Sequence, residues 1–135
     1  MAQDYPTAKR VLLVDDESKF CQVVAEFLRG RGYEVATAGS GTEALLALDR
    51  FVPDVMVLDI RMPGLSGLEL LKLVRSRFFV PRIIMVTVLD PEEAAQEAIR
   101  LGANAYMCKP VDLNQLEQLI SGIWPAQPAP QAPST

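Results

Sequence analysis

Five polar residues in this sequence end short apolar runs and carry side chains suited to phosphate chemistry. Two acids follow the run 11–14, one acid follows 55–58, a hydroxyl follows 83–86 and a lysine follows 105–108. In chain order they are Asp15, Asp16, Asp59, Thr87 and Lys109. Carboxylates about 4 Å apart repel by on the order of 4 kcal/mol per pair at an effective dielectric near 20, so three in one site favour a cation. Mg²⁺ suits a few carboxylates plus a phosphate oxygen.

Brought together, these side chains would offer a nucleophilic carboxylate, a charge-offsetting metal and two donors for the oxygens of a transferring phosphoryl group. The predicted product is an aspartyl phosphate. Asp59 ends a run of four apolar residues, which predicts a strand buried on both faces. Pro63 and Gly64 favour a turn soon afterwards, so this carboxylate lies at an edge that a ligand can reach. The sequence contains no histidine, which excludes His-based catalysis, His–metal sites and a phosphohistidine of the chain's own.

The elements that must position these residues alternate regularly along the chain. We predict strands at 11–14, 33–38, 54–59, 83–87 and 105–108. Amphipathic helices are predicted between them and after the last strand, over 20–28, 40–48, 68–74, 90–101 and 112–123. Helix starts are marked by Ser40 with Glu43 as a capping box, by Asp90 with Pro91 and by Asp112, and helix ends by Gly30, Gly32 and Gly102. Asp16 could instead cap the first helix.

Five strands alternating with five helices predict an α/β fold, with a parallel sheet covered on both faces and joined by right-handed crossovers. Such sheets bind ligands beyond the carboxyl ends of their strands, where all five polar residues stand. A chain of 135 residues, half of them hydrophobic, suits one domain. We assign residues 1–9 to an N-terminal arm, 10–123 to the domain and 124–135 to a linker or tail rich in Pro, Ala and Gln.

Composition narrows the functional classes. The 17 acids and 13 bases give a net charge of −4 without a basic run, so we expect no direct nucleic-acid contact. Cys21 and Cys108 are too few for a disulfide framework and too far apart for a metal-binding pair, which favours reduced thiols in an intracellular protein. The first nine residues lack a signal-peptide profile, and no apolar run is long enough for a membrane span. We therefore expect a cytoplasmic protein.

With these motifs, the stretch from Arg10 to Ile123 resembles the receiver domain of two-component response regulators, the chemotaxis-type receiver. The resemblance implies a flavodoxin-like, doubly wound sheet with strand order 2-1-3-4-5. It rests on the acid pair Asp15-Asp16, the strand into Asp59 with Met62-Pro63-Gly64 after it, Thr87, and Gly102-Ala103 leading through Tyr106 to Lys109-Pro110.

The resemblance implies roles for these residues. Asp59 would accept a phosphoryl group from a sensor histidine kinase or a phosphotransfer protein. Asp16, Asp59 and the main-chain carbonyl of Arg61 would bind Mg²⁺ or Mn²⁺, with Asp15 assisting through water. Lys109 and Thr87 would hold the phosphoryl oxygens, and the Lys109–Pro110 bond would be cis.

The resemblance also implies a two-state switch. Thr87 would move toward the phosphate and Tyr106 would turn inward, which would remodel the face of the fourth helix, fifth strand and fifth helix. That face would control an output domain or a downstream partner, and it allows a phosphorylation-dependent homodimer. Such a receiver is not an enzyme beyond its own phosphoryl transfer and autodephosphorylation.

Other interpretations stay open. A degenerate receiver could act as a phosphate-independent binding module. An aspartate-based phosphatase would need a second acid where Arg61 stands, and a nucleotide or flavin binder would need a phosphate loop where Asp15 and Asp16 stand. Val88 is bulkier than the small residue usual after Thr87 in the family, which predicts slow phosphorylation by small donors and slow loss of phosphate.

Overall fold

The computed structural model describes residues 10–77, 81–88 and 92–123. The assigned arm at 1–9, the assigned tail at 124–135 and the expected helix start at Asp90 and Pro91 lie outside the described residues. Among the residues that are described, no helix is both long and apolar enough to cross a membrane.

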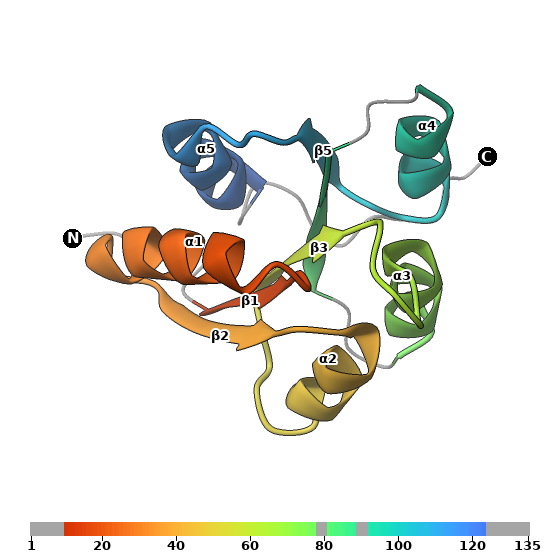
Figure 1. Ribbon diagram of the computed structural model, residues 1–135, viewed down its shortest axis with the longest axis horizontal. Helices are drawn as coiled ribbons and strands as arrows, with labels where there is room; N and C mark the ends of the chain where they lie inside the picture. The colour runs from red at the N-terminus through yellow and green to blue at the C-terminus, as the bar shows by residue number, and fades with distance from the viewer. Residues whose placement is uncertain (1–9, 78–80, 89–91, 124–135) are drawn as a thin grey trace.

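Strands and helices alternate along the described chain as the sequence predicts (Figure 1). The strands are β1 (Arg10–Val14), β2 (Glu34–Ala38), β3 (Val55–Asp59), β4 (Arg82–Thr87) and β5 (Ala105–Cys108). The helices are α1 (Ser18–Gly30), α2 (Gly41–Leu48), α3 (Gly67–Arg75), α4 (Glu92–Arg100) and α5 (Leu113–Ile123). All strand pairs are parallel and the order is β2-β1-β3-β4-β5, which confirms the predicted fold class.

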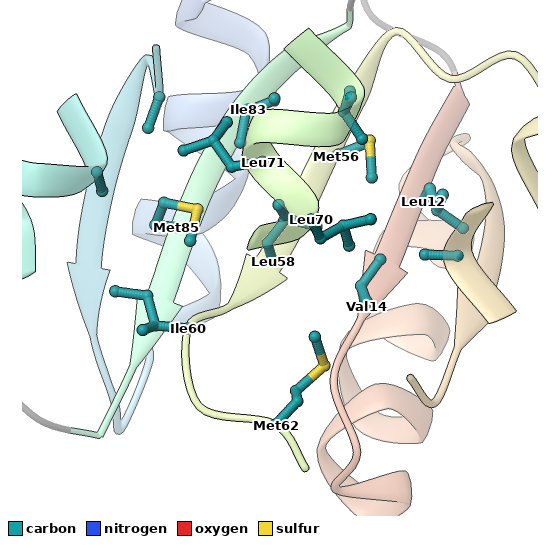
Figure 2. Packing of buried hydrophobic residues seen from close by; sticks show 14 of the residues in the cluster. Leu12, Val14, Met56, Leu58, Ile60, Met62, Leu70, Leu71, Ile83 and Met85 are labelled. Atoms are coloured by element: carbon teal, nitrogen blue, oxygen red, sulfur yellow. The ribbon is translucent and has the colours of Figure 1, made fainter. Parts of the chain in front are cut away.

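Helices cover both faces of the sheet, with α1 and α5 on one side and α2, α3 and α4 on the other (Figure 1). Every residue of β3 and β4 is buried, as expected for central strands packed on both faces. Figure 2 shows the cluster on the α3 side, where Leu70 and Leu71 pack with Leu58 of β3 and Met85 of β4. Two such cores hold the carboxyl ends of the strands in a fixed arrangement.

Helix termini agree only partly with the predictions. Ser40 Oγ accepts the Glu43 N–H at 3.1 Å, but Glu43 Oε1 accepts the N–H of Gly39 at 2.8 Å instead of closing the predicted box. A complete capping box occurs at Ser66 and Glu69, which the sequence reading did not single out. Two other expectations hold: Asp112 Oδ1 accepts the Gln115 N–H at 3.1 Å, and Gly32 (φ +96°) and Gly102 (φ +114°) are in the left-handed region after their helices.

The predicted cap of the first helix is also different. The N-cap of α1 is Glu17 rather than Asp16. The acid that bonds to backbone at this corner is Asp15, whose Oδ1 accepts the Glu17 N–H at 2.9 Å. The capping interpretation of Asp16 is therefore wrong, and its carboxylate is left for the acidic corner.

The loop after β3 is held close to Asp59. Gly67 begins α3, and its N–H donates to Ile60 O at 2.9 Å. A Cβ at Gly67 would lie 2.1 Å from the main-chain oxygen of Asp59, so this approach requires glycine. The backbone contact fixes the position at which β3 delivers Asp59.

Candidate functional site

Three carboxylates meet at the carboxyl edge of the sheet. Val14 of β1 is paired with Leu58 of β3, so the acids that follow these positions become neighbours. Carboxylate oxygens of Asp15, Asp16 and Asp59 all lie within 4.8 Å of one another. Asp15 and Asp59 are buried, whereas Asp16 is exposed to solvent. The predicted cluster therefore exists, with two buried members and one open to water.

Asp15 is held by several contacts. Its Oδ2 lies 2.7 Å from Lys109 Nζ, and its N–H donates to Ala38 O at 3.1 Å. The thiol of Cys21 donates to Asp15 O at 3.4 Å. Its Oδ1 accepts the Glu17 N–H, whereas among the described residues the buried Oδ2 is held by the ion pair with Lys109. Asp15 is thus fixed in orientation by the protein itself.

Asp59 lies in a position that disfavours its charge. Burial, followed by repulsion from Asp15 and then Asp16, raises its pKa to about 6, although the Arg61 N–H and Lys109 oppose the shift. The Arg61 N–H donates to Oδ1 at 3.2 Å, and Lys109 Nζ lies 3.7 Å from Oδ2. A cation near the three acids would relieve this repulsion.

Lys109 joins β5 to the acid cluster. Its Nζ contacts Asp15 and, at 2.9 Å, Glu17 Oε1, and it lies 4.3 Å from the centroid of the Phe20 ring. Burial alone would lower its pKa, but the hydrogen bonds to Asp15 and Glu17 outweigh burial and raise the pKa to about 12. Lys109 is therefore a permanent cation at physiological pH. The Lys109–Pro110 peptide bond is cis, as the resemblance implies.

Thr87 brings an unused hydroxyl to the same edge. Asp59 is paired with Val86, so Thr87 lies one residue further along the neighbouring strand. Thr87 is 1% exposed, and its Oγ1 has no hydrogen-bond partner among the described residues. A buried donor without a partner is uncommon and marks a group available to a ligand. Thr87 O also accepts the Lys109 N–H at 2.7 Å.

The remaining predicted residues lie around this centre. Arg61 follows Asp59 in an exposed position of the loop. Tyr106 is half-buried in β5, beside Met85, and packs against the α3-side core. Sequence reasoning missed Glu17, which contacts Lys109, and Phe20, whose ring lies beside the Lys109 ammonium. The position of Glu17 directly after the acid pair Asp15-Asp16 was the sequence feature that could have pointed to it.

The acid cluster fits a hard divalent cation. Carboxylate oxygens are the ligands that Mg²⁺ and Mn²⁺ take in proteins, and three of them converge here. The pKa of the buried Asp59 is also raised to about 6, so its ionised form is disfavoured unless a cation lies nearby. The donor set therefore agrees with the metal that the sequence predicts.

An apolar groove adjoins the cluster. Its volume is about 580 Å³, and Glu17 and Lys109 belong to its lining. Val88 is 59% exposed at this groove rather than packed into the core. The apolar lining comes from α1, from Val88 and from the segment after β5, and includes Phe20, Val23, Val24, Val88, Val111 and Leu113.

Comparisons with known proteins agree with this arrangement. The family described as the response regulator receiver domain matches residues 11–121. The chain is 38% identical over 106 residues to the sensory transduction protein RegX3 of Mycolicibacterium smegmatis, covering 78% of this chain and 46% of that protein. It thus spans about half the length of the curated relatives it matches.

Two solved structures have the same fold. The chemotaxis protein CheY4 of Vibrio cholerae is 34% identical, with a TM-score of 0.80 over 86% of this chain and 98% of that one. A response regulator of Burkholderia pseudomallei, solved with a phosphorylated aspartic acid, a calcium ion and citrate, is 27% identical. Its TM-score is 0.78, over 83% of this chain and 66% of that one.

Proposed function

The chain belongs to the response regulator receiver domain family, and from this premise we propose that it is a signalling switch phosphorylated on Asp59. The observation that carries the proposal is the meeting of three carboxylates, a permanent cation and a buried, unbonded hydroxyl at one sheet edge. A phosphorylated aspartate and a divalent cation in the Burkholderia relative support it.

Phosphoryl transfer needs little covalent chemistry from the protein beyond a nucleophile. Asp59 would attack phosphorus through a carboxylate oxygen, forming an acyl phosphate as the bond from phosphorus to the donor's leaving group breaks. A Mg²⁺ or Mn²⁺ ion held by Asp16, Asp59 and the Arg61 carbonyl would offset charge on the phosphoryl oxygens. Asp15, whose Oδ1 accepts the Glu17 N–H and whose Oδ2 lies 2.7 Å from Lys109 Nζ, would act on the metal through water.

Two side chains would hold the transferred group. Lys109 already lies 3.7 Å from Asp59 and would bind one phosphoryl oxygen. Thr87 would donate its free hydroxyl to another, which would satisfy a donor that has no partner in the described part of the chain. Movement of Thr87 and Tyr106 would then alter the face formed by α4, β5 and α5, which would act on an output domain or partner.

Two observations bear on the partners of this domain: the sequence has no histidine, and it spans about half the length of the curated relatives it matches. The phosphodonor would be a sensor histidine kinase or phosphotransfer protein, in the cytoplasm. We propose residues 10–123 as the receiver, 1–9 as an arm and 124–135 as a linker or tail. A phosphorylation-dependent homodimer is compatible with this arrangement, and the charge of −4 argues against nucleic-acid contact by this domain.

Intact-mass measurement tests the proposal. The protein is incubated with Mg²⁺ and a small acyl phosphate, beside an Asp59→Asn variant and a sample containing EDTA. We expect one added phosphoryl group on the wild type in the presence of Mg²⁺. Neither the Asp59→Asn variant nor the sample with EDTA should gain it. If neither acyl phosphate nor phosphorylated sensor kinases produce this adduct, the chain acts as a phosphate-independent binding module instead.

A further inference from the structure

Glu17 stands at the N-cap of α1, but its side chain does not cap the helix. No capping hydrogen bond joins its carboxylate to the described first turn. Its Oε1 instead lies 2.9 Å from Lys109 Nζ, 92 positions away in the sequence. Asp, Asn and Ser are the preferred N-caps, so helix formation does not explain a glutamate here.

A phosphoryl group on Asp59 would give Lys109 more anionic neighbours than it has N–H donors. Its ammonium carries three N–H donors. Two of its contacts are short, 2.7 Å to Asp15 and 2.9 Å to Glu17, whereas Asp59 lies at 3.7 Å. In the resting protein Lys109 therefore favours the β1–α1 corner over the phosphoacceptor.

Glu17 is the contact that can be released. The Asp15 side chain is 3% exposed, so losing the ion pair between its Oδ2 and Lys109 would leave a buried charge unpaired. The Glu17 side chain is 62% exposed, so water can replace Lys109 as its partner at little cost. Lys109 can thus leave Glu17 without leaving a buried charge unpaired.

We infer that Glu17 is a positioning residue that holds Lys109 back from Asp59 and lowers the affinity of the site for a phosphoryl group. The inference rests on the proposed function and adds Glu17 as a competitor for Lys109, the cation of that site. Removing the Glu17 carboxylate should free Lys109 for the phosphoryl oxygen. An ion pair with one exposed partner corresponds to about a two- to fivefold effect.

Charge repulsion between Glu17 and the incoming anion would change the same measurements, so two variants separate the mechanisms. Glu17→Asp keeps the charge but is one methylene shorter, and aspartate favours the capping position. It should therefore release Lys109 and behave like Glu17→Gln. In a Lys109→Gln background, Glu17→Gln should have no effect, because the residue acts through Lys109.

The experiment measures binding of beryllofluoride, a phosphoryl analogue, by calorimetry at saturating Mg²⁺, together with the rate of phosphorylation by an acyl phosphate. Glu17→Gln should bind about two- to fivefold more tightly and react faster by a similar factor. Glu26→Gln removes an exposed acid from the same helix and should match the wild type.

Three results would overturn the inference. The first two are a beryllofluoride affinity and phosphorylation rate equal to those of the wild type in Glu17→Gln, or in Glu17→Asp. The third is an effect of Glu17→Gln that is as large in the Lys109→Gln background as in the wild type. In each case the wild type still binds beryllofluoride and still gains its phosphoryl group, so the proposed function stands. A wild type that does neither would overturn both.

Discussion

Replacing Asp59 by asparagine should stabilise the metal-free protein at neutral pH. Burial, followed by the charge of Asp15, raises the pKa of Asp59 to about 6, against about 3.9 in an unfolded chain. The ionised carboxylate is therefore less stable in the folded protein than in the unfolded one. Asparagine has nearly the same shape, keeps an oxygen for the Arg61 N–H and carries no charge.

The size of the effect follows from the pKa. A difference of about two pKa units corresponds to about 3 kcal/mol, which solvent screening around the exposed Asp16 reduces to about 1–2 kcal/mol. Because the folded pKa is the higher one, the folded protein binds more protons between about pH 4 and 6. Wild-type stability therefore falls as pH rises through this window, and the whole penalty is present above about pH 7. At about pH 5 roughly half of it remains.

Urea unfolding with EDTA at about pH 7.5 and pH 5 measures this difference. The free energy of unfolding of Asp59→Asn should exceed that of the wild type by about 1–2 kcal/mol at the higher pH and by about half as much at the lower. Mg²⁺ should reduce this difference, because it binds and stabilises the folded wild type. Asp49→Asn, at an exposed acid 3.9 Å from Arg77, should change stability by less than about 0.5 kcal/mol at both pH values. An Asp59 variant no more stable than the wild type, or equally favoured at both pH values, would refute the reasoning.

Three further predictions concern neighbouring residues. Val88→Ala should speed both phosphorylation by small donors and loss of phosphate, whereas Val23→Ala, at another exposed valine of the groove, should change neither; unchanged rates in both would remove Val88 as an obstacle. Thr87→Val should leave the unphosphorylated protein at least as stable in urea, because the hydroxyl has no partner among the described residues, while weakening beryllofluoride binding; unchanged binding would exclude Thr87 from the site. Gly67→Ala should destabilise by about 1–3 kcal/mol and slow phosphorylation, since its Cβ would meet Asp59 O at 2.1 Å. Gly30→Ala, with nothing within 4 Å, is its matched control, and an equal loss in the two would contradict the proposed contact.

The sequence predicts the central site because parallel strands end at a common edge. Asp15, Asp59, Thr87 and Lys109 each follow an apolar run, so strand alternation alone brings them together. The side-chain partners are not encoded in this way. Ser40–Glu43 and Ser66–Glu69 have the same spacing, yet only the second closes a box, because the N–H of Gly39 takes the carboxylate of Glu43.

Glu17 and Lys109 show the same limit over a longer range. Their contact joins residues 92 positions apart and depends on which of three nearby acids the ammonium reaches first. The order does not follow burial: the buried Asp15 lies at 2.7 Å, the exposed Glu17 at 2.9 Å and the buried Asp59 at 3.7 Å. Spacing in a sequence carries no information about such a ranking.

The backbone around Lys109 suggests how its side chain could transmit a signal. The Lys109 N–H donates to Thr87 O at 2.7 Å, so the two proposed phosphoryl ligands are tied at the ends of adjacent strands. A phosphoryl group on Asp59 would draw the Lys109 amine from Glu17 and the Thr87 hydroxyl toward the same point. Since β4 precedes α4 and β5 precedes α5 in the chain, both pulls would act on the strands that come before these helices. A local exchange of one ion pair would thereby reach the face that we propose contacts the output.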